Sequence, residues 1–284
     1  MSKARVSICC VLVAVATAIP RICAAQTDPA NPVTIAEAYR LFYNAHYEEA
    51  AALALTLRSS GTHDLENDEV RTSALLFQLR GLLKGHDGRD GDKADKAEAF
   101  KRCATCGDVL AAFITDLNHG QALARETLKT KPNDEYALFF LGKLDLNYVW
   151  LQLGLLGRKT GWDEYWEARK SLEAVLKLNP NHVRARVARG WIDYIVNTRM
   201  PWGTRWVLGG GNKKRGITVV REAAAMEADF FTRAEAEFAL WDLHVRERDF
   251  ARATELAQKL AQTFPDNKEV AQYLAKRTTS RATR

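Results

Sequence analysis

Residues 135–182 read EYALFFLGKLDLNYVWLQLGLLGRKTGWDEYWEARKSLEAVLKLNPNH, and residues 183–230 repeat their pattern as VRARVARGWIDYIVNTRMPWGTRWVLGGGNKKRGITVVREAAAMEADF. The positions that match at an offset of 48 are Gly142 and Gly190, Asp145 and Asp193, Ala168 and Gly216, and residues 179–182 and 227–230. Self-similarity at a fixed period of a few tens of residues is typical of stacked helix pairs, because one pair alone cannot bury its apolar face. The stretch therefore predicts an all-α protein built from helical repeats.

Apolar residues at helical spacing predict further helix pairs on both sides of this repeat. The expected pairs are residues 35–45 with 47–57, 65–84 with 92–102, 109–117 with 121–131, 135–153 with 162–178, 183–197 with 213–226, and 232–246 with 250–263. Residues 268–276 are expected to cap the stack, since terminal repeats need a polar outer face. With 284 residues, 47% of them hydrophobic, the chain can bury a substantial core in one elongated domain.

Two segments near the ends of the chain share a pattern of small and apolar residues. The pattern consists of Leu240, Asp249, Phe250, Ala253, Pro265, Asp266 and Asn267 in residues 234–267, and of Ala38, Leu41, Tyr47 and Ala50 in residues 31–64. Both segments resemble the tetratricopeptide (TPR) repeat, a helix pair of about 34 residues. Trp241 departs from the family, which usually has glycine at that position. The resemblance implies a right-handed superhelix of about six antiparallel helix pairs over residues 26–277, followed by a basic disordered tail at 278–284.

The two central units are longer than the family's repeat, by 48 − 34 = 14 residues each. These inserts are expected at residues 151–164 and 199–212, between the two helices of each pair. Six of the seven tryptophans lie between positions 150 and 206, and residues 199–215 contain five basic residues and no acidic one. The candidate ligand- or partner-binding residues are Trp150, Trp162, Trp166, Trp202, Trp206, Lys213, Lys214 and Arg215. The alternative is that the inserts only add to the core, with Asn212 as an ordinary N-cap.

The N-terminus has the features of a secretory signal peptide. Lys3 and Arg5 precede an apolar run at residues 6–19, and the small residues Ala24 and Ala25 follow it. Cleavage after residue 25 would remove three of 41 basic residues and no acid, which lowers the net charge from +6 to +3. We therefore expect a periplasmic or secreted protein without a membrane span after cleavage. We expect no nucleic-acid binding, because Lys276, Arg277, Arg281 and Arg284 account for the whole excess and leave the folded part close to neutral.

Cys103 and Cys106 are the two cysteines that would remain after that cleavage. A C-x-x-C pair in an exported protein can form a disulfide, stay reduced, or take part in metal or redox chemistry. Haem attachment would need histidine where Gly107 stands, and the nearest histidines for a zinc site, His86 and His119, are more than ten residues away. A structural disulfide between two helices is the preferred interpretation, with no metal and no cofactor.

Known catalytic motifs are absent from the sequence, so we do not expect an enzyme. Asp145 and Asp193 are expected to accept hydrogen bonds or ion pairs that fix the packing of the repeats, since buried carboxylates are costly without partners. The TPR resemblance implies an exported scaffold that grips a peptide, a protein or a small ligand through its concave face or its tryptophan-rich inserts. One alternative is a periplasmic accessory of a solute transporter, similar in architecture to the T-component of TRAP systems, with a closed pocket lined by tryptophans. The other is an enzyme whose site lies in the inserts.

Overall fold

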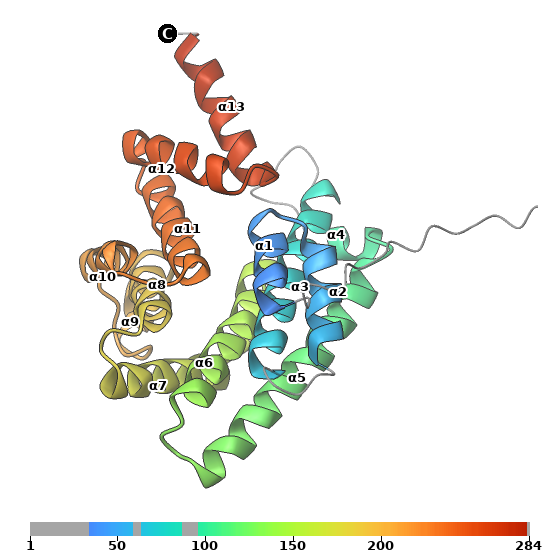
Figure 1. Ribbon diagram of the computed structural model, residues 1–284, viewed down its shortest axis with the longest axis vertical. Coiled ribbons are helices and arrows are strands. Elements are labelled where there is room, and N and C mark those ends of the chain that lie inside the picture. Colours follow the sequence, from blue (N-terminus) through green and yellow to red (C-terminus); the bar gives the residue numbers. More distant parts are fainter. Residues whose placement is uncertain (1–33, 59–63, 87–95, 283–284) are drawn as a thin grey trace, which may run out of the picture. The chain divides into compact units, whose positions relative to one another are not determined.

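The computed structural model of the chain describes residues 34–58, 64–86 and 96–282 (Figure 1). Within these residues it contains thirteen α-helices, one short π-helix and no strand, which confirms the all-α class. None of the described helices combines the length and the apolar character that crossing a membrane requires. The expected signal peptide, residues 1–25, lies outside the described residues.

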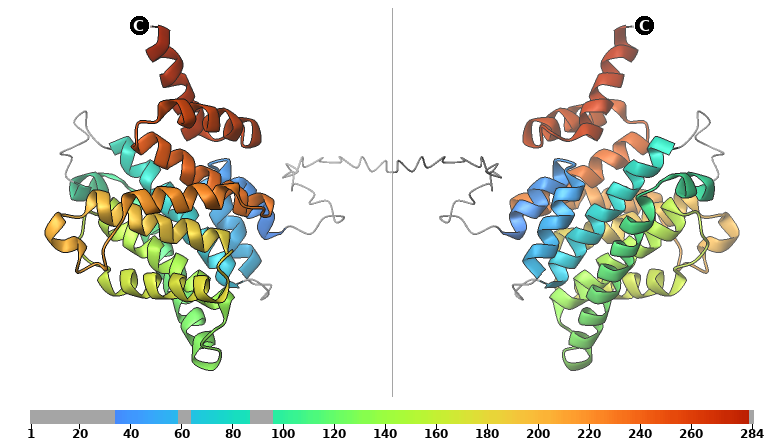
Figure 2. Two further views of the ribbon diagram at one scale, coloured as in Figure 1. Left: turned by 90° about the vertical axis from the view of Figure 1, so that its left-hand side faces the viewer. Right: turned by 90° about the vertical axis from the view of Figure 1, so that its right-hand side faces the viewer.

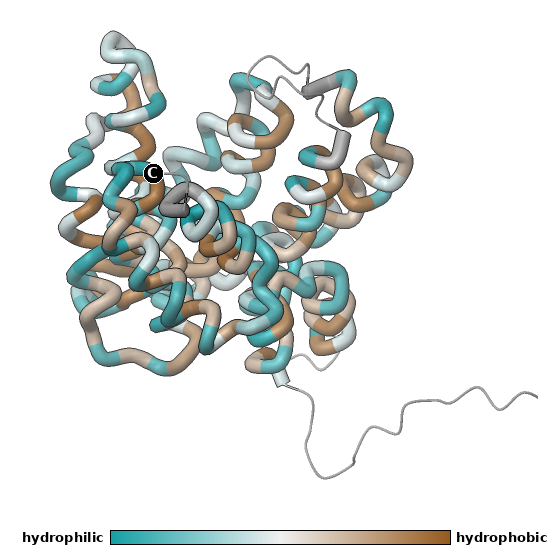
Figure 3. Tube along the Cα trace, turned by 90° about the horizontal axis from the view of Figure 1, so that it is seen from above, coloured by the Kyte–Doolittle hydropathy of each residue, from teal (hydrophilic) through white to brown (hydrophobic). Residues whose placement is uncertain are grey.

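The helices pack mainly against their neighbours in the chain. In chain order they are α1 (Ile35–Tyr43), α2 (Tyr47–Arg58), α3 (Asp64–His86), α4 (Lys96–Arg102), α5 (Cys106–Thr130), α6 (Glu135–Val149), η1 (Trp150–Leu155), α7 (Trp162–Leu178), α8 (Val183–Arg199), α9 (Trp202–Arg205), α10 (Lys213–Ala225), α11 (Phe230–Arg246), α12 (Phe250–Thr263) and α13 (Lys268–Ala282). Apolar and polar stretches alternate along most of them, as expected of helices that bury one face (Figure 3).

Several helices begin at a side chain that caps them. The carboxylate of Asp134 accepts a hydrogen bond of 2.9 Å from the backbone N–H of Ala137, three residues into α6. Asn212 does the same at the start of α10, where its Oδ1 lies 2.9 Å from the N–H of Arg215. Such caps satisfy backbone donors that have no partner inside the helix. The N-cap interpretation of Asn212 is therefore confirmed.

The repeated glycines allow close contact between paired helices, α6 with α7 and α8 with α10. A Cβ atom on Gly142 would lie 2.9 Å from Leu172 Cγ. On Gly190 it would lie 2.9 Å from Val220 Cγ2 and 3.0 Å from the carbonyl oxygen of Gly216. Glycine at these two positions lets the backbones approach more closely than any side chain would permit. The offset of 48 residues thus reflects two equivalent helix–helix contacts.

Two predicted boundaries were wrong. The pair expected at residues 109–117 and 121–131 is one continuous helix, α5, so the predicted count of pairs does not hold. Gly120 lies inside α5, where a Cβ atom would meet Leu144 Cδ1 of α6 at 2.7 Å. Its role is close packing rather than a turn. At the other end, α13 continues to Ala282, so the expected disordered tail is helical as far as that residue.

The first described helix contacts the last three, which differs from an elongated domain with separate ends. Asn267, just before α13, donates a hydrogen bond of 2.7 Å from its Nδ2 to the carbonyl oxygen of Tyr43 in α1. The ring of Tyr43 also stacks on Phe238 of α11, at 5.3 Å between centroids, and lies 5.4 Å from Phe264. Aromatic residues at both ends of the described chain thus share one core, because together they remove large apolar faces from water.

A buried cluster of four charges lies beneath this contact, on α3, α6, α8 and α11. Arg184 lies 3.0 Å from Glu69 and 2.5 Å from Glu235, and Lys143 lies 2.6 Å from Glu235 and 3.5 Å from Glu69. Burial alone would raise the pKa of Glu235, but the charges of Arg184 and Lys143 outweigh it and lower that pKa to about 2. Two cations and two anions leave the cluster neutral, which is how buried charges are tolerated.

Candidate functional site

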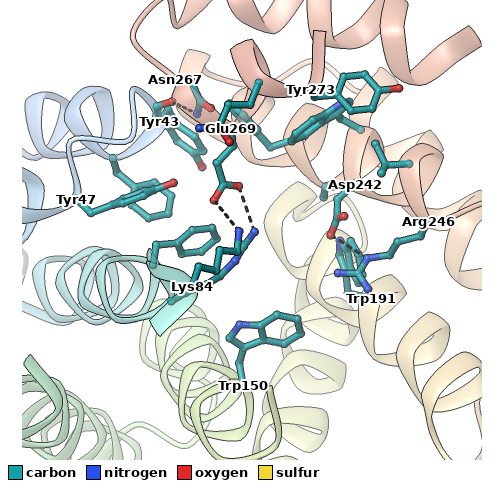
Figure 4. Close-up of a pocket in the computed structure, with 18 of the residues that line it drawn as sticks. Tyr43, Tyr47, Lys84, Trp150, Trp191, Asp242, Arg246, Asn267, Glu269 and Tyr273 are labelled. Carbon is teal, nitrogen blue, oxygen red and sulfur yellow. Dashed lines mark hydrogen bonds and ion pairs between the residues drawn. The ribbon is translucent and has the colours of Figure 1, made fainter. Parts of the chain in front are cut away.

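The main cavity of the described residues has a volume of about 640 Å³ and is walled by aromatic side chains from both ends of the chain (Figure 4). Three tryptophans contribute to it: Trp150 at the start of η1, Trp191 of α8 and Trp241 of α11. The other lining residues are Phe42, Tyr43, Tyr47, Phe77, Arg80, Lys84, Phe238, Ala239, Asp242, Val245, Arg246, Asn267, Glu269, Gln272, Tyr273 and Lys276. We call this space the aromatic cavity. It exists because α1 and α11–α13 meet.

A second space of about 330 Å³ adjoins the aromatic cavity, and we call it the apolar chamber. The two share the lining residues Phe77, Trp150, Trp191, Ala239 and Asp242. Most of the remaining walls are apolar, and they include Leu146, Val149, Leu153, Trp162, Ile192, Ile195, Met200 and Leu208. Volumes of a few hundred Å³ with apolar walls and a few polar groups are typical of small-molecule sites.

Charged side chains stand around the aromatic cavity. Four of its lining residues are basic and two are acidic, which gives a net charge of 4 − 2 = +2. Glu269 of α13 lies 3.3 Å from Arg80 and 3.9 Å from Lys84, both on α3 (Figure 4). Arg246 lies 3.0 Å from Asp242, and its guanidinium stands 5.3 Å from the centre of the Trp191 ring. The excess of positive charge favours a ligand with a negative group.

Neutral polar groups complete the cavity. Burial raises the pKa of the hydroxyls of Tyr43 and Tyr47, so both remain protonated at physiological pH. The indole N–H of Trp241 is buried and has no hydrogen-bond partner among the described residues. An unpaired buried donor costs roughly 1–3 kcal/mol, so a ligand oxygen that reached this N–H would remove that penalty. The cavity can therefore combine stacking, hydrogen bonding and attraction of an anion.

The predicted site residues are divided among three environments. Trp150 lines both cavities and Trp162 lines the apolar chamber. Trp166 is half-buried, and its ring packs against that of Tyr165 at 5.5 Å between centroids. Trp202 and Trp206 are exposed to water, and neither makes a ring contact with another aromatic residue among those described. The five tryptophans therefore differ in burial and in what they line.

The three basic residues of the predicted site also differ from one another. Lys213 lies 2.6 Å from Glu247, the C-cap residue of α11, and Arg215 lies 2.8 Å from Asp193 of α8. Lys214 is exposed and forms no ion pair with the residues that the structure describes. Two of the three therefore hold α10 against its neighbours.

Sequence analysis did not select most of the cavity residues. Trp191 and Trp241 were missed as site residues, as were Tyr43, Tyr47 and Glu269. Trp241 carried a signal, because it stands where the family that the chain resembles usually has glycine. A large aromatic residue at a helix-contact position must point elsewhere, and here it lines the cavity. The other residues lie on helices far apart in the chain, so no local pattern connects them.

The repeated carboxylates pack the fold, as expected, and line neither cavity. Asp145 is fully buried and accepts a hydrogen bond of 2.7 Å from Gln121 Nε2. Burial, with the nearby charge of Glu167, raises the pKa of Asp145 to about 8. Asp193, at the matching position, accepts hydrogen bonds of 2.7 Å from Arg189 and 2.8 Å from Arg215. The hydrogen bonds from Gln121 of α5 and Arg215 of α10 connect neighbouring helices, whereas Arg189 lies on α8 with Asp193.

The predicted disulfide is confirmed. The sulfurs of Cys103 and Cys106 lie 1.99 Å apart, and the bond joins the residue after α4 to the first residue of α5. Among the described residues, no group of three histidine, cysteine or acidic side chains is arranged to hold a metal ion.

Comparison of the sequence with known proteins adds no relative to this description. No family model matches the chain, and no curated protein matches it in sequence.

Proposed function

We propose that this protein is an exported scaffold of TPR-like helix pairs that binds a small organic anion with a flat apolar body. The observation that carries the proposal is the aromatic cavity, in which Trp150, Trp191 and Trp241 surround a space of about 640 Å³ with a net positive charge. Aromatic walls favour planar ligands, and a cation beside an aromatic ring favours an anionic group on them.

The arrangement of the two cavities suggests how such a ligand lies. Its apolar end would enter the chamber past Trp150 and Trp191, which line both spaces. Its anionic group would stay in the aromatic cavity, near Arg80 and Lys84 of α3. Glu269 now neutralises these two cations in part and would compete with the ligand. The volume fits a small molecule better than a folded partner or an extended peptide.

The proposed location is the periplasm or the exterior of the cell. The bond between Cys103 and Cys106 supports it, because disulfides persist in oxidising compartments. Of the roles considered for such a protein, the accessory of a solute transporter agrees best with a tryptophan-lined cavity. The catalytic alternative has less support, since Asp145, the carboxyl group with a strongly raised pKa, lines neither space.

Two fluorescent probes test the proposal. 1-Anilinonaphthalene-8-sulfonate is a flat aromatic anion, and N-phenyl-1-naphthylamine has nearly the same aromatic body without the sulfonate. We expect saturable binding of both at one site. Trp191→Ala should weaken the binding of both probes by about tenfold or more, since buried tryptophans commonly contribute about 2 kcal/mol to binding. Lys84→Ala should weaken the binding of the sulfonate probe and leave that of the uncharged probe unchanged.

Trp202→Ala is the matched control, because it removes an indole from outside both cavities. It should leave the affinity for both probes unchanged, and circular dichroism should show that all variants keep their helices. Equal affinity of Trp191→Ala and the unchanged protein, or a Trp202→Ala variant that loses binding, would rule out the aromatic cavity as the site.

A further inference from the structure

Residues 200–212, between α8 and α10, hold two tryptophans in water. Trp202 is 85% exposed and Trp206 is 78% exposed, and the neighbouring Val207 is 52% exposed. Figure 2 shows this segment projecting from the helical body. We call it the tryptophan segment. Exposed tryptophan is unfavourable in water, so two of them four residues apart indicate a surface with a partner.

The base of the tryptophan segment is fixed to the fold. Leu208 is buried, and its carbonyl oxygen accepts hydrogen bonds of 2.8 Å from Tyr165 Oη and 2.8 Å from Arg169 Nη1. Arg169 also donates to the carbonyl oxygen of Gly209, at 3.0 Å. Gly209 and Gly210 have φ values of 73° and 71°, which glycine adopts easily. The two indoles are therefore presented by an anchored segment.

The charge around the segment has one sign. Between Asp193 and Glu222 the sequence has no acidic residue, and its six basic residues are Arg199, Arg205, Lys213, Lys214, Arg215 and Arg221. Lys213 and Arg215 are neutralised by acidic side chains of the fold. The side chains that form no ion pair among the described residues are Arg199, Arg205, Lys214 and Arg221. Arg205 follows Trp202 by three residues in α9, the spacing at which two side chains of a helical turn lie on the same face.

We propose that the tryptophan segment docks on the surface of an anionic lipid bilayer, with Trp202 and Trp206 at the level of the headgroups. Tryptophan is enriched at membrane–water interfaces, where its ring is partly buried and its N–H stays hydrated. Basic residues near an anionic leaflet add electrostatic attraction. The combination requires no membrane-spanning helix and gives reversible, salt-sensitive binding.

A bilayer fits the shape of the segment better than an acidic protein surface does. Specific protein interfaces bury about 800 Å² on each partner around a packed core. The tryptophan segment projects from the body, and a Cβ atom on Gly203 would meet no atom within 4 Å outside its chain neighbours and its own helix backbone. It therefore offers a wedge rather than a groove, and a fluid interface can close around a wedge.

Flotation with lipid vesicles tests this inference separately from the proposed function. The full chain without residues 1–25 is mixed with vesicles of phosphatidylcholine, or of phosphatidylcholine with about one third phosphatidylglycerol. We expect flotation with the anionic vesicles only, and its loss when salt is raised to about 0.5 M. The double variant W202A/W206A should bind these vesicles at least about tenfold more weakly than the unchanged protein.

Matched variants separate docking from unfolding. Leu178→Ala removes an apolar side chain that is 46% exposed at the end of α7, and it should leave flotation unchanged. Lys214→Glu should weaken it, whereas Lys131→Glu, at the end of α5, should not. W202A/W206A should keep its thermal midpoint and its affinity for the naphthylamine probe. Failure of the unchanged protein to float, or equal flotation of W202A/W206A, would overturn the proposal, and retained probe binding would show that the aromatic cavity is unaffected.

Discussion

Glu269 Oε2 of α13 lies 3.3 Å from Arg80 Nη2 of α3, and both side chains line the aromatic cavity. The same carboxylate lies 3.9 Å from Lys84. About a third of each of the Arg80 and Glu269 side chains is exposed, so the ion pair contributes little stability and can separate readily. An anionic ligand can take the place of Glu269 beside Arg80 and Lys84.

This relationship predicts the effect of Glu269→Gln. The variant keeps the shape of the side chain and removes the negative charge that competes with the ligand. We expect the affinity for 1-anilinonaphthalene-8-sulfonate to rise by about three- to tenfold, which corresponds to about 1 kcal/mol. Fluorescence titration measures it. Glu255→Gln, on the exposed face of α12, removes the same charge elsewhere and should have no effect.

The glycine contact between α8 and α10 predicts opposite outcomes for two glycine-to-alanine changes. Gly190→Ala places a Cβ atom 2.9 Å from Val220 and 3.0 Å from a backbone oxygen, so it should lower the free energy of unfolding by about 1–3 kcal/mol. In α3, a Cβ atom on Gly81 would meet nothing within 4 Å. Gly81→Ala should therefore raise the free energy of unfolding by about 0.5–1 kcal/mol. Thermal or urea unfolding distinguishes them. A neutral Gly190→Ala would show that the two helices are not in close contact.

The buried Asp145 predicts a dependence of stability on pH. The pKa of its carboxyl group is raised from 3.8 to about 8, so between these values the folded protein holds a proton that the unfolded chain has released. Its contribution to stability therefore falls as pH rises through this window, by up to about 1.4 kcal/mol per pH unit. Asp145→Asn cannot lose a proton and should be less sensitive to pH over the same range.

Urea unfolding of the unchanged protein and of Asp145→Asn from pH 5 to pH 9 measures how the stability of each depends on pH. Asp193→Asn serves as the comparison, because that carboxylate is paired with Arg189 and Arg215 and its removal should already destabilise the protein at neutral pH. Parallel curves for Asp145→Asn and the unchanged protein would show that Asp145 is ionised in the folded state.

The disulfide predicts the absence of free thiols and a modest effect on stability. Protein that lacks residues 1–25 should show no reactive thiol under denaturing conditions, since Cys103 and Cys106 are bonded. The bond closes a very short loop, and the loop-entropy relation gives about 2 kcal/mol for its removal by reduction. Thiol titration and a comparison of unfolding with and without reductant measure the two quantities. Two free thiols would argue against an oxidising compartment.

The sequence predicted the helical class because it depends on short-range patterns. Apolar periodicity sets the helices, and the offset between Gly142 and Gly190 marks two sites where backbones touch. The disulfide followed from two cysteines three residues apart. The continuous helix α5 was missed because Gly120 packs against Leu144 of another helix, a contact that local sequence does not show.

The candidate site was predictable only in part for a related reason. Trp150 and Trp162 stood out by composition and do line the cavities. The contributions of Tyr43 and Glu269 depend on the meeting of α1 with α11–α13, which joins residues more than two hundred positions apart. The apolar periodicity within α1 or within α11–α13 does not indicate that these helices contact each other.

The contact between Tyr43 and Asn267 also limits how this protein can evolve. An open array of helical repeats can gain or lose a unit without disturbing distant ones, because each unit touches only its neighbours. Here the addition or deletion of one 48-residue unit would carry α1 away from α11 and α13, open the shared aromatic core and remove one wall of the cavity. The contact therefore ties the length of the chain between α1 and α13 to the integrity of the aromatic core.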